Sequence, residues 1–428
     1  MTPSAAPLRV AVVARAVMPL HGVGGLERSV RDLVCHLAAC GVDVTLIVPP
    51  PAPVQRRTRA DPFASPHITL RHVRYLTFPF SNRRGTTILD RSTAYLLYGV
   101  RAGRLALGLV RRGEVDVVHG FGASVLGYAG PRRRTARTGR GGAIAPLVLN
   151  PQGLEEFGAT AGSQARLKRA GYTPLRRAVR RCARAADCII ATDVALEPTV
   201  TRHLRPRPGQ MCTIPNGIDL AEAADLAGPA DGALMRRRHG IGSTELLLLS
   251  VGRLEHNKGF DVLAAALARA AQAPALAAGW RWVIVGMGAQ RREIERLVDA
   301  HRLAPHVLFA GRATDADLHA WYEAASVFVH PTRYEGSSLV TLEAMAHRSP
   351  VIATRAGGLP DKVRPGENGW LVDPEAPDAL AAAIVDAASQ PGRLPIMGAA
   401  SRAIVERDFA WATLVDRQIA LYRALLEV

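Results

Sequence analysis

The sequence has 428 residues, of which 48% are hydrophobic and 5% aromatic, and it carries a formal net charge of +17. This length exceeds what one hydrophobic core usually serves, which excludes a single small domain and predicts two domains. No apolar run approaches the ~20 residues that a membrane-spanning helix needs, and the first 16 residues lack the features of a signal peptide, so we expect a cytoplasmic protein.

The first half alternates between strand-like and helix-like stretches. A buried strand at 8–16, a helix at 26–41 and a strand at 43–50 form one βαβ unit, with a glycine-rich turn between the first strand and the helix. The glycines Gly22, Gly24 and Gly25 fit a tight turn and a phosphate contact equally well. Further strands are predicted at 115–121, 145–151 and 187–193, and loops at 51–95 and 131–143.

The same alternation restarts in the second half. Strands are predicted at 245–254, 281–288, 307–311, 326–331 and 350–354, and helices at 260–272, 289–303, 316–325 and 339–347. The predicted fold is therefore α/β, with two doubly wound Rossmann-like domains that face each other across a cleft. We expect domains at 1–215 and 216–408, and a C-terminal amphipathic helix within 409–428 that returns to pack on the first domain.

The positive charge is concentrated in the first half. Residues 1–215 hold 32 Lys and Arg against 12 Asp and Glu, whereas residues 216–428 hold 22 against 25. The basic runs at 131–140 and 166–184 contain no interleaved aromatic pattern typical of nucleic-acid binding, so no nucleic-acid partner is expected. An anionic membrane surface or a phosphate-bearing acceptor fits better, which leaves peripheral attachment at the inner face of the membrane open. The five cysteines lack metal-site spacing, which predicts reduced thiols.

The segment EGSSLVTLE, residues 335–343, is the most informative one. It predicts a turn that carries Glu335 and a helix that carries Glu343. Backbone N–H groups of Gly336, Ser338 and Leu339 at the start of this helix would suit a phosphate. Carboxylates beside an anion site would accept hydrogen bonds from hydroxyl groups. Together these features predict a nucleotide-sugar site.

Two cations lie at the end of the strand predicted at 245–254 and in the loop after it. Arg253 and Lys258 could neutralise a diphosphate as its bond breaks, although two solvated surface cations would give the same pattern. Asp315 and Asp317 match a metal-binding DxD pattern, but Thr314 before them is also typical of a helix N-terminus. We prefer the helix cap, and expect no metal and no other cofactor.

Polar residues near strand ends in the first half are candidates for acceptor binding. His119 follows a buried strand and could reach the cleft as a catalytic group, and His21 lies in the glycine-rich turn. Asn150 and Gln152 end another predicted strand. A lone histidine is more often structural than catalytic.

Taken together, the motifs resemble those of the family-4 glycosyltransferases, which are retaining enzymes with the GT-B fold. The matching segments are GGLER, DVVHG, IPNGID, VGRLEHNKG, VIVGMG, EGSSLVTLE, RAGGLPD and ENGWLVDP. The resemblance covers nearly the whole chain and is most specific in the second half. Two positions depart from the family pattern: Phe121 and Gln152 stand where many relatives have histidine.

The resemblance implies a role for each matching residue. Arg253 and Lys258 would hold the donor diphosphate, Glu335 would bind sugar hydroxyls and Glu343 would bind the ribose. Gly25 would close on the phosphate from the first domain, and Arg312 would lie near the base. The implied activity is retaining transfer from a nucleotide-diphosphate sugar to a glycan or glycolipid acceptor in cell-envelope or extracellular polysaccharide synthesis. The alternatives are a nucleotide-sugar epimerase and a non-catalytic nucleotide-sugar-binding protein.

Overall fold

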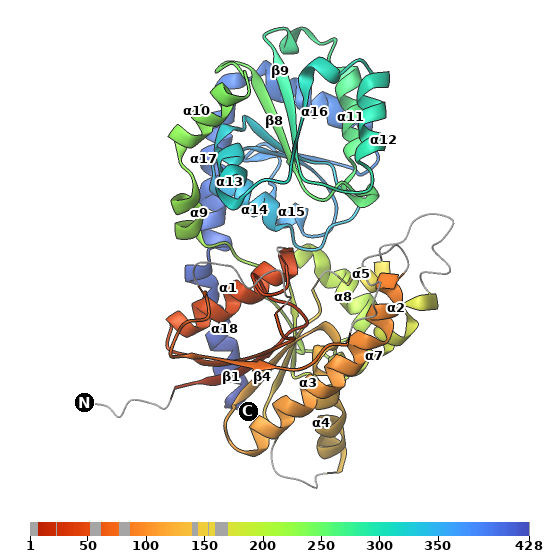
Figure 1. Ribbon diagram of the computed structural model, residues 1–428, viewed down its shortest axis with the longest axis vertical. Helices are drawn as coiled ribbons and strands as arrows, with labels where there is room; N and C mark the ends of the chain where they lie inside the picture. The colour runs from red at the N-terminus through yellow and green to blue at the C-terminus, as the bar shows by residue number, and fades with distance from the viewer. Residues whose placement is uncertain are drawn as a thin grey trace, which may run out of the picture. The chain divides into compact units, whose positions relative to one another are not determined.

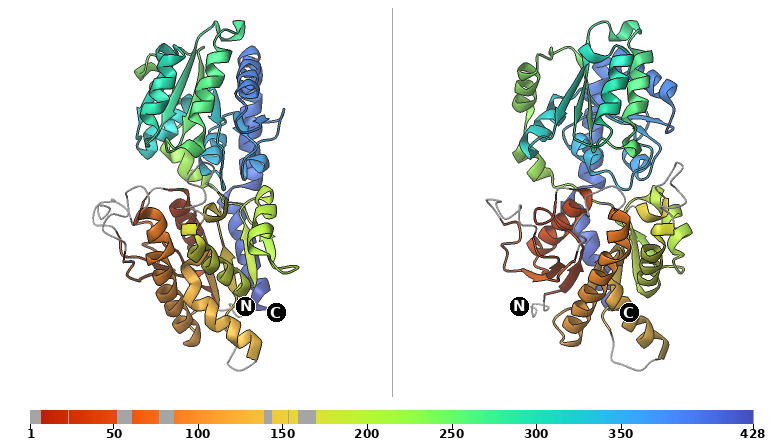
Figure 2. Two further views of the ribbon diagram at one scale, coloured as in Figure 1. Left: turned by 90° about the vertical axis from the view of Figure 1, so that its right-hand side faces the viewer. Right: turned by 45° about the vertical axis from the view of Figure 1, so that its right-hand side comes forward.

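The computed structural model describes residues 7–22, 24–51, 61–76, 86–138, 144–152, 154–158 and 170–427. The chain divides into two compact units: Met1–Asn216 with Leu414–Val428, and Gly217–Thr413. Each unit is built around a parallel sheet that helices cover on both faces (Figures 1 and 2). The predicted doubly wound α/β class is confirmed. Within the described residues, no helix is both long and apolar enough to cross a bilayer.

The first unit contains a seven-stranded sheet within its described part, in the order β3-β2-β1-β4-β5-β6-β7. Its strands are β1 (Arg9–Val13), β2 (Asp43–Val48), β3 (Ile68–His72), β4 (Val117–Phe121), β5 (Leu147–Asn150), β6 (Cys188–Ala191) and β7 (Met211–Thr213). Its longer helices are α1 (Gly25–Ala39), α2 (Thr86–Ser92), α3 (Ala94–Arg111), α4 (Leu126–Thr138), α7 (Thr173–Ala185), α8 (Glu197–Leu204) and α18 (Trp411–Leu426), and α5 (Glu155–Gly158) is a single turn.

The second unit contains a six-stranded sheet in the order β10-β9-β8-β11-β12-β13. Its strands are β8 (Leu246–Val251), β9 (Trp280–Val285), β10 (Val307–Gly311), β11 (Val327–His330), β12 (Val351–Thr354) and β13 (Gly369–Val372). Its helices are α9 (Leu220–Leu226), α10 (Pro229–Arg238), α11 (Phe260–Ala270), α12 (Arg291–Ala300), α13 (Asp315–Ala324), α14 (Leu339–Ala346), α15 (Leu359–Lys362), α16 (Pro377–Ser389) and α17 (Leu394–Asp408).

The strands are apolar without alternation because the sheets are buried on both faces. In β8, Leu247 and Leu249 pack in one cluster with α13 and α14, and Leu248 packs in the opposite cluster with α11 and α12. The same arrangement in both units makes the sheets rigid platforms. It directs the loops that follow the strands to one edge, where ligands of such folds bind.

Two segments that the sequence predicts as loops contain regular structure. Residues 51–95 include β3 and α2, and residues 131–143 include the second half of α4. The helical periodicity of α4 is not evident in the sequence because Pro131 and three arginines interrupt its apolar pattern. Its buried side includes Tyr128 and Ala129. Helix α4 packs closely on α3 through small residues: a Cβ atom on Gly127 would lie 2.0 Å from the carbonyl oxygen of Val100.

Helix α18 covers the end of β4. The phenol of Tyr422 lies 2.6 Å from Nδ1 of His119, although the two residues are 303 positions apart. The His119 ring also stacks on Phe121, with ring centroids 5.0 Å apart. Only 1% of His119 is exposed. Burial lowers the pKa of His119 to about 3, so the ring is neutral at neutral pH.

The burial of His119 predicts acid sensitivity of the fold. Below the ordinary histidine pKa of about 6.5 the unfolded chain binds a proton that folded His119 does not. We therefore expect the free energy of unfolding to decrease as the pH falls from about 6.5 towards about 3, by up to about 1.4 kcal/mol per pH unit from this residue.

Urea unfolding across this pH range tests the prediction. The His119→Gln variant should show a shallower slope than the wild type, whatever its absolute stability. Replacement of the exposed His301 by glutamine is the matched control and should leave the slope unchanged. Equal slopes in the wild type and His119→Gln would contradict the prediction.

Candidate active site

The candidate site of the second unit lies at the edge of the sheet where the strand order reverses. From β8 the chain proceeds outward to β9 and β10, and it then returns to β11 and proceeds to β12 and β13 on the other side. The loops that follow β8 and β11 therefore diverge and leave a crevice at the carboxyl ends of these strands. Lys258 lies in the first loop and Glu335 in the second.

The two loops meet through an ion pair. Nζ of Lys258 lies 2.6 Å from Oε2 of Glu335. The side chain of Lys258 is 14% exposed and that of Glu335 is 15% exposed. Nε2 of His330, the last residue of β11, lies 2.8 Å from the same carboxylate oxygen. The ring of His330 is buried. One carboxylate is thus held between an ammonium group and an imidazole at the end of the central strands.

The electrostatics keep this carboxylate ionised. Burial alone would raise the pKa of Glu335, but the charge of Lys258 and the hydrogen bonds from His330 and Lys258 outweigh burial and hold the pKa well below its usual range. Burial lowers the pKa of His330, and its hydrogen bond to Glu335 opposes this only in part. A neutral His330 that donates Nε2–H to Glu335 is consistent with both shifts. Glu335 can therefore accept hydrogen bonds but cannot act as a general acid.

The turn that carries Glu335 leads directly into α14. Ser338 precedes the helix, and no side chain of the described residues caps its first N–H groups, so these donors are available at the helix N-terminus. Gly357 lets a neighbouring loop pack against the turn: its φ is +55°, and an added Cβ would lie 1.8 Å from the carbonyl oxygen of Glu335. The buried ammonium of Lys362 lies 3.2 Å from the Gly358 carbonyl oxygen and 3.4 Å from Oγ of Ser337. This positive environment suits a phosphate.

Arg333 fixes the two loops relative to each other. Its guanidinium donates two hydrogen bonds of 2.7 Å to the carboxylate of Asp261, in the first turn of α11, and a further one to the carbonyl oxygen of His256. It also pairs with Glu375. The charge of Arg333 outweighs the burial of Asp261 and lowers the pKa of that carboxyl. Arg333 thereby sets the position of Lys258 opposite Glu335.

Replacement of Arg333 by methionine is expected to weaken the connection between the loops that carry Lys258 and Glu335. We expect the free energy of unfolding to fall by about 2 kcal/mol, because charged hydrogen bonds of a largely buried group are lost. Affinity for a nucleotide sugar should fall with it. Urea unfolding and ligand titration measure both effects. The control Arg269→Met removes an exposed ion pair with Asp378 and should cost about 0.5 kcal/mol or less. Equal losses in the two variants would show that Arg333 does not hold the two loops together.

Glu343 lies inside α14 and points to α13. Its Oε2 accepts a hydrogen bond of 2.8 Å from the hydroxyl of Tyr322, and only 4% of the residue is exposed. Tyr322 is itself packed between the rings of Phe328 and His347. Tyr322 therefore orients the Glu343 carboxylate.

The other residues predicted for donor binding are more exposed. The side chain of Arg253 is 68% exposed and pairs with Glu255 across 2.8 Å. Arg312 follows β10 and is exposed. Thr314 caps α13 by accepting the N–H of Asp317 at 3.1 Å, so the preferred interpretation of the TDADL segment is confirmed.

Comparison with known proteins places this site in a family. A family model described as "Glycosyl transferases group 1" matches residues 245–390, and one described as "Glycosyltransferase Family 4" matches residues 23–222. The chain is a family-4 glycosyltransferase. The range 245–390 lies in the second unit and includes the loops after β8 and β11, and the range 23–222 lies in the first unit except for its last six residues.

Individual relatives agree with this assignment. The D-inositol 3-phosphate glycosyltransferase of Streptomyces scabiei is 34% identical over 250 residues, which cover 57% of this chain and 55% of that protein, about half its length. The protein of the same name from Acidothermus cellulolyticus is 29% identical over 442 residues, covering 98% of this chain and 91% of that protein. The structure of sucrose-phosphate synthase from Thermosynechococcus elongatus is similar with a TM-score of 0.71 and 27% identity, over 98% of this chain and 99% of that one. The glycosyltransferase therefore has the GT-B fold.

The histidines predicted in the first unit of the glycosyltransferase are engaged by the protein itself. His119 does not reach solvent, contrary to the prediction, because α18 and Phe121 cover it. We therefore withdraw it as a candidate catalytic group. His21 is half-buried: its Nε2 lies 2.9 Å from the Pro49 carbonyl oxygen and its Nδ1 contacts the backbone of Val17. It fastens the turn after β1 to the end of β2 and is not a free acceptor ligand.

The other first-unit candidates lie at strand ends. Gly25 is the first residue of α1 and is exposed, and the carboxylate of Glu27 lies against Gly24 at this helix N-terminus. An anion bound here would have to displace Glu27. Asn150 accepts the N–H of Gln152 at 3.0 Å, and Nε2 of Gln152 is buried without a hydrogen-bond partner among the described residues. Acceptor binding by these two residues stays a prediction.

Several residues of the site were missed from the sequence. His330, Tyr322, Arg333 and Lys362 all contact or position predicted site residues. His330 directly ends an apolar strand, which is the one signal that could have indicated it. The other three are recognisable only by their partners in space.

Proposed function

We propose that the glycosyltransferase is a retaining enzyme that moves a sugar from a nucleotide-diphosphate donor to a hydroxyl group of a glycan or glycolipid. The observation that carries this proposal is the contact of Lys258 and His330 with Glu335 at the switch point of the second sheet, beside the N-terminus of α14. A cationic and a neutral hydrogen-bond donor and an ionised carboxylate thus lie close together where the nucleotide sugar would bind.

Each group has a distinct task in this proposal. The N–H groups at the start of α14 and Lys258, with Arg253, would bind the diphosphate and stabilise its charge as it leaves. Glu335 would accept hydrogen bonds from sugar hydroxyls and support the positive charge that develops on the sugar. Glu343, oriented by Tyr322, would bind the ribose. A nucleotide diphosphate is already a good leaving group, so no strong acid is needed, and retention would follow from attack on the same face with the departing phosphate accepting the acceptor proton.

The acceptor is inferred from the first unit. Its excess of arginine favours an acceptor that is anionic or presented at an anionic membrane, as in envelope or extracellular polysaccharide synthesis. The five cysteines are free thiols, which supports our placing the enzyme in the cytoplasm, at the inner face of the membrane. Two relatives are named D-inositol 3-phosphate glycosyltransferase, which supports a phosphate-bearing acceptor as the alternative.

A donor screen tests the proposal without knowledge of the acceptor. Thermal unfolding is measured with UDP-, GDP- and ADP-sugars; a ligand at about 100 times its Kd stabilises by about 2.7 kcal/mol. One base series should raise the Tm, and Lys258→Ala should abolish the shift. The selected donor is then incubated with candidate acceptors, and the anomeric configuration of the product is determined by NMR spectroscopy.

The same experiment separates the rival functions. Conversion of the donor to another nucleotide sugar without acceptor would show an epimerase, and binding without turnover across the acceptor panel would support a non-catalytic protein. An inverted product would contradict the retaining mechanism while leaving glycosyl transfer intact.

A further inference from the structure

Three helices of the first unit contain arginines but no acidic residue. The helices α3, α4 and α7 pack side by side, α3 on α4 and α4 on α7. The sequence places three arginines in α3, four in α4 and five in α7, and neither Asp nor Glu in any of them. This charge is not the bulk property of an arginine-rich chain, because the helices of the second unit, taken together, contain acidic as well as basic residues.

On two of these helices, α3 and α7, arginines occupy a solvent-facing stripe. On α3, Arg101, Arg104 and Arg111 recur at helical spacing and are exposed. On α7, a matching stripe is formed by Arg177, Arg181 and Arg184, which are also exposed. Within the described part of the chain, none of these six arginines forms an ion pair. Their charge is therefore directed outward and uncompensated. We refer to these six residues and the helices that carry them as the basic face.

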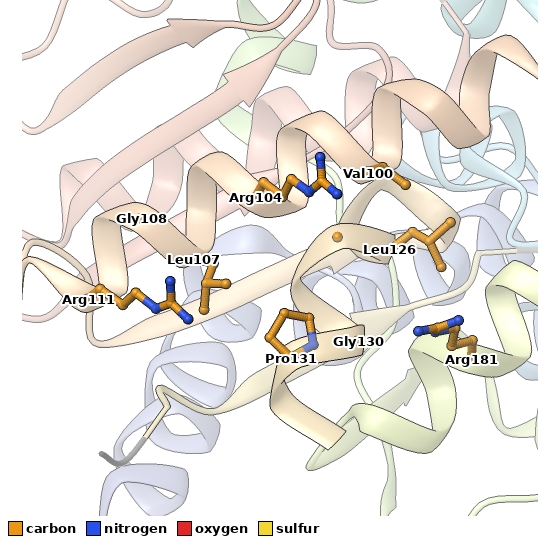
Figure 3. Close-up of a pocket in the computed structure, with 10 residues that line it drawn as sticks. Val100, Arg104, Leu107, Gly108, Arg111, Leu126, Gly130, Pro131 and Arg181 are labelled. Atoms are coloured by element: carbon orange, nitrogen blue, oxygen red, sulfur yellow. The ribbon is translucent and has the colours of Figure 1, made fainter. Parts of the chain in front are cut away.

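The basic face encloses a pocket of about 580 Å³ (Figure 3). Arg104 and Arg111 from α3 and Arg181 from α7 stand around it, and Leu107, Leu126 and Pro131 line it between them. The pocket exists because small residues lie where α3 and α4 cross: Gly108, Gly127 and Gly130 contribute no side chain to fill it. Three guanidinium groups over an apolar lining suit a phosphate that is attached to hydrocarbon.

The composition of the basic face distinguishes between its conceivable partners. Tyr95, Tyr98 and Tyr128, the aromatic residues of these helices, are at most 6% exposed, so the face offers no ring on which a base could stack. In contrast, Leu97 continues the arginine stripe of α3 and is 58% exposed. Exposed leucine among arginines is the composition of a surface that lies in a lipid interface.

We propose that the basic face is a docking surface for a bilayer that contains anionic phospholipids, and that Arg104, Arg111 and Arg181 bind a lipid phosphate at the pocket. The face shares no residue with the candidate donor site, which lies in the other unit. The proposal deepens the membrane placement in the proposed function and rests on that part of it. Glycosyl transfer is tested separately by the donor screen, so docking and transfer can each fail without the other.

Vesicle sedimentation of the full chain tests the proposal. Vesicles of phosphatidylcholine alone are compared with vesicles of equal parts phosphatidylcholine and phosphatidylglycerol, at low and high salt. We expect binding only to the anionic vesicles, and weaker binding at high salt because the attraction is screened. The variant Arg104→Gln/Arg111→Gln/Arg181→Gln should lower the partition coefficient roughly 100-fold, since each arginine near an anionic surface contributes about a factor of five.

A matched triple variant separates the basic face from net charge. Arg237, Arg292 and Arg296 are exposed in the second unit, and their replacement by glutamine removes the same charge. This control should bind as the wild type does. A second variant of the basic face, Arg101→Gln/Arg177→Gln/Arg184→Gln, should lose binding as the first does, and all variants should keep the wild-type Tm and donor-induced shift.

Three results would overturn the proposal. Equal losses in the control and the basic-face variants would assign binding to net charge alone. Equal binding to neutral and anionic vesicles would exclude phosphate recognition. Retention of binding to single-stranded RNA at a salt concentration that releases the protein from anionic vesicles would assign the face to nucleic acid instead.

Discussion

Replacement of Lys258 by alanine is expected to lower kcat by about 100- to 1,000-fold, the usual effect of removing one fixed donor from a developing negative charge. Lys258 is well placed for this task, because it lies at the switch point and is only 14% exposed, where water screens its charge poorly. In the ligand-free protein its ammonium is held by Glu335, so its position is fixed before the donor binds. KM for the donor should rise as well, because the same cation contacts the diphosphate in the ground state.

Steady-state kinetics with the donor found by the thermal screen measure this effect. Lys258→Arg should recover part of the activity, since the charge is kept but the position of the donors changes. Arg269→Ala is the control: it removes an exposed cation of α11 whose partner Asp378 is 85% exposed, and kcat should not change. Wild-type kcat in Lys258→Ala would exclude Lys258 from leaving-group stabilisation.

Glu335→Gln is expected to lower kcat/KM by roughly 10-fold, because a charged hydrogen bond of about 1.5–3 kcal/mol to the sugar is replaced by a neutral one of about 0.5–1.5 kcal/mol. The substitution keeps the shape of the side chain, so the loss reports charge rather than packing. Since Lys258 and His330 hold the pKa of Glu335 well below its usual range, its ionisation should not appear in the pH–rate profile near neutrality. An acid limb there would have to come from another group.

The contact between Lys258 and Glu335 predicts that the effects of substituting them are coupled. Because Lys258 and Glu335 are 2.6 Å apart, their substitutions should not be additive, and the double variant should lose less than the product of the single losses. Glu295→Gln, on the exposed side of α12, is the control for loss of a carboxylate. Near-normal turnover of Glu335→Gln with the native donor would exclude the proposed role.

Features that depend on neighbouring residues could be predicted from the sequence alone. Apolar runs without alternation predicted the parallel sheets, and the turn between β11 and α14 predicted where Glu335 lies and that an anion site lies beside it. These features could be read directly because strand burial, helix initiation and glycine turns depend on residues a few positions apart. The resemblance of the motifs then indicated the family that the comparisons show.

Tertiary structure alone decided which side chains meet. Glu335 and Lys258 are 77 residues apart in the chain, and only the reversal of strand order between β8 and β11 brings them into one crevice. His119 lies within β4, two residues before the end of the strand, yet Tyr422 of a helix 303 residues later contacts and covers it. The arginines of α3 and α7 look like scattered charge in the sequence, and become one face around a pocket only because these helices pack on α4. Contacts between distant elements depend on the path of the whole chain, which local sequence patterns do not predict.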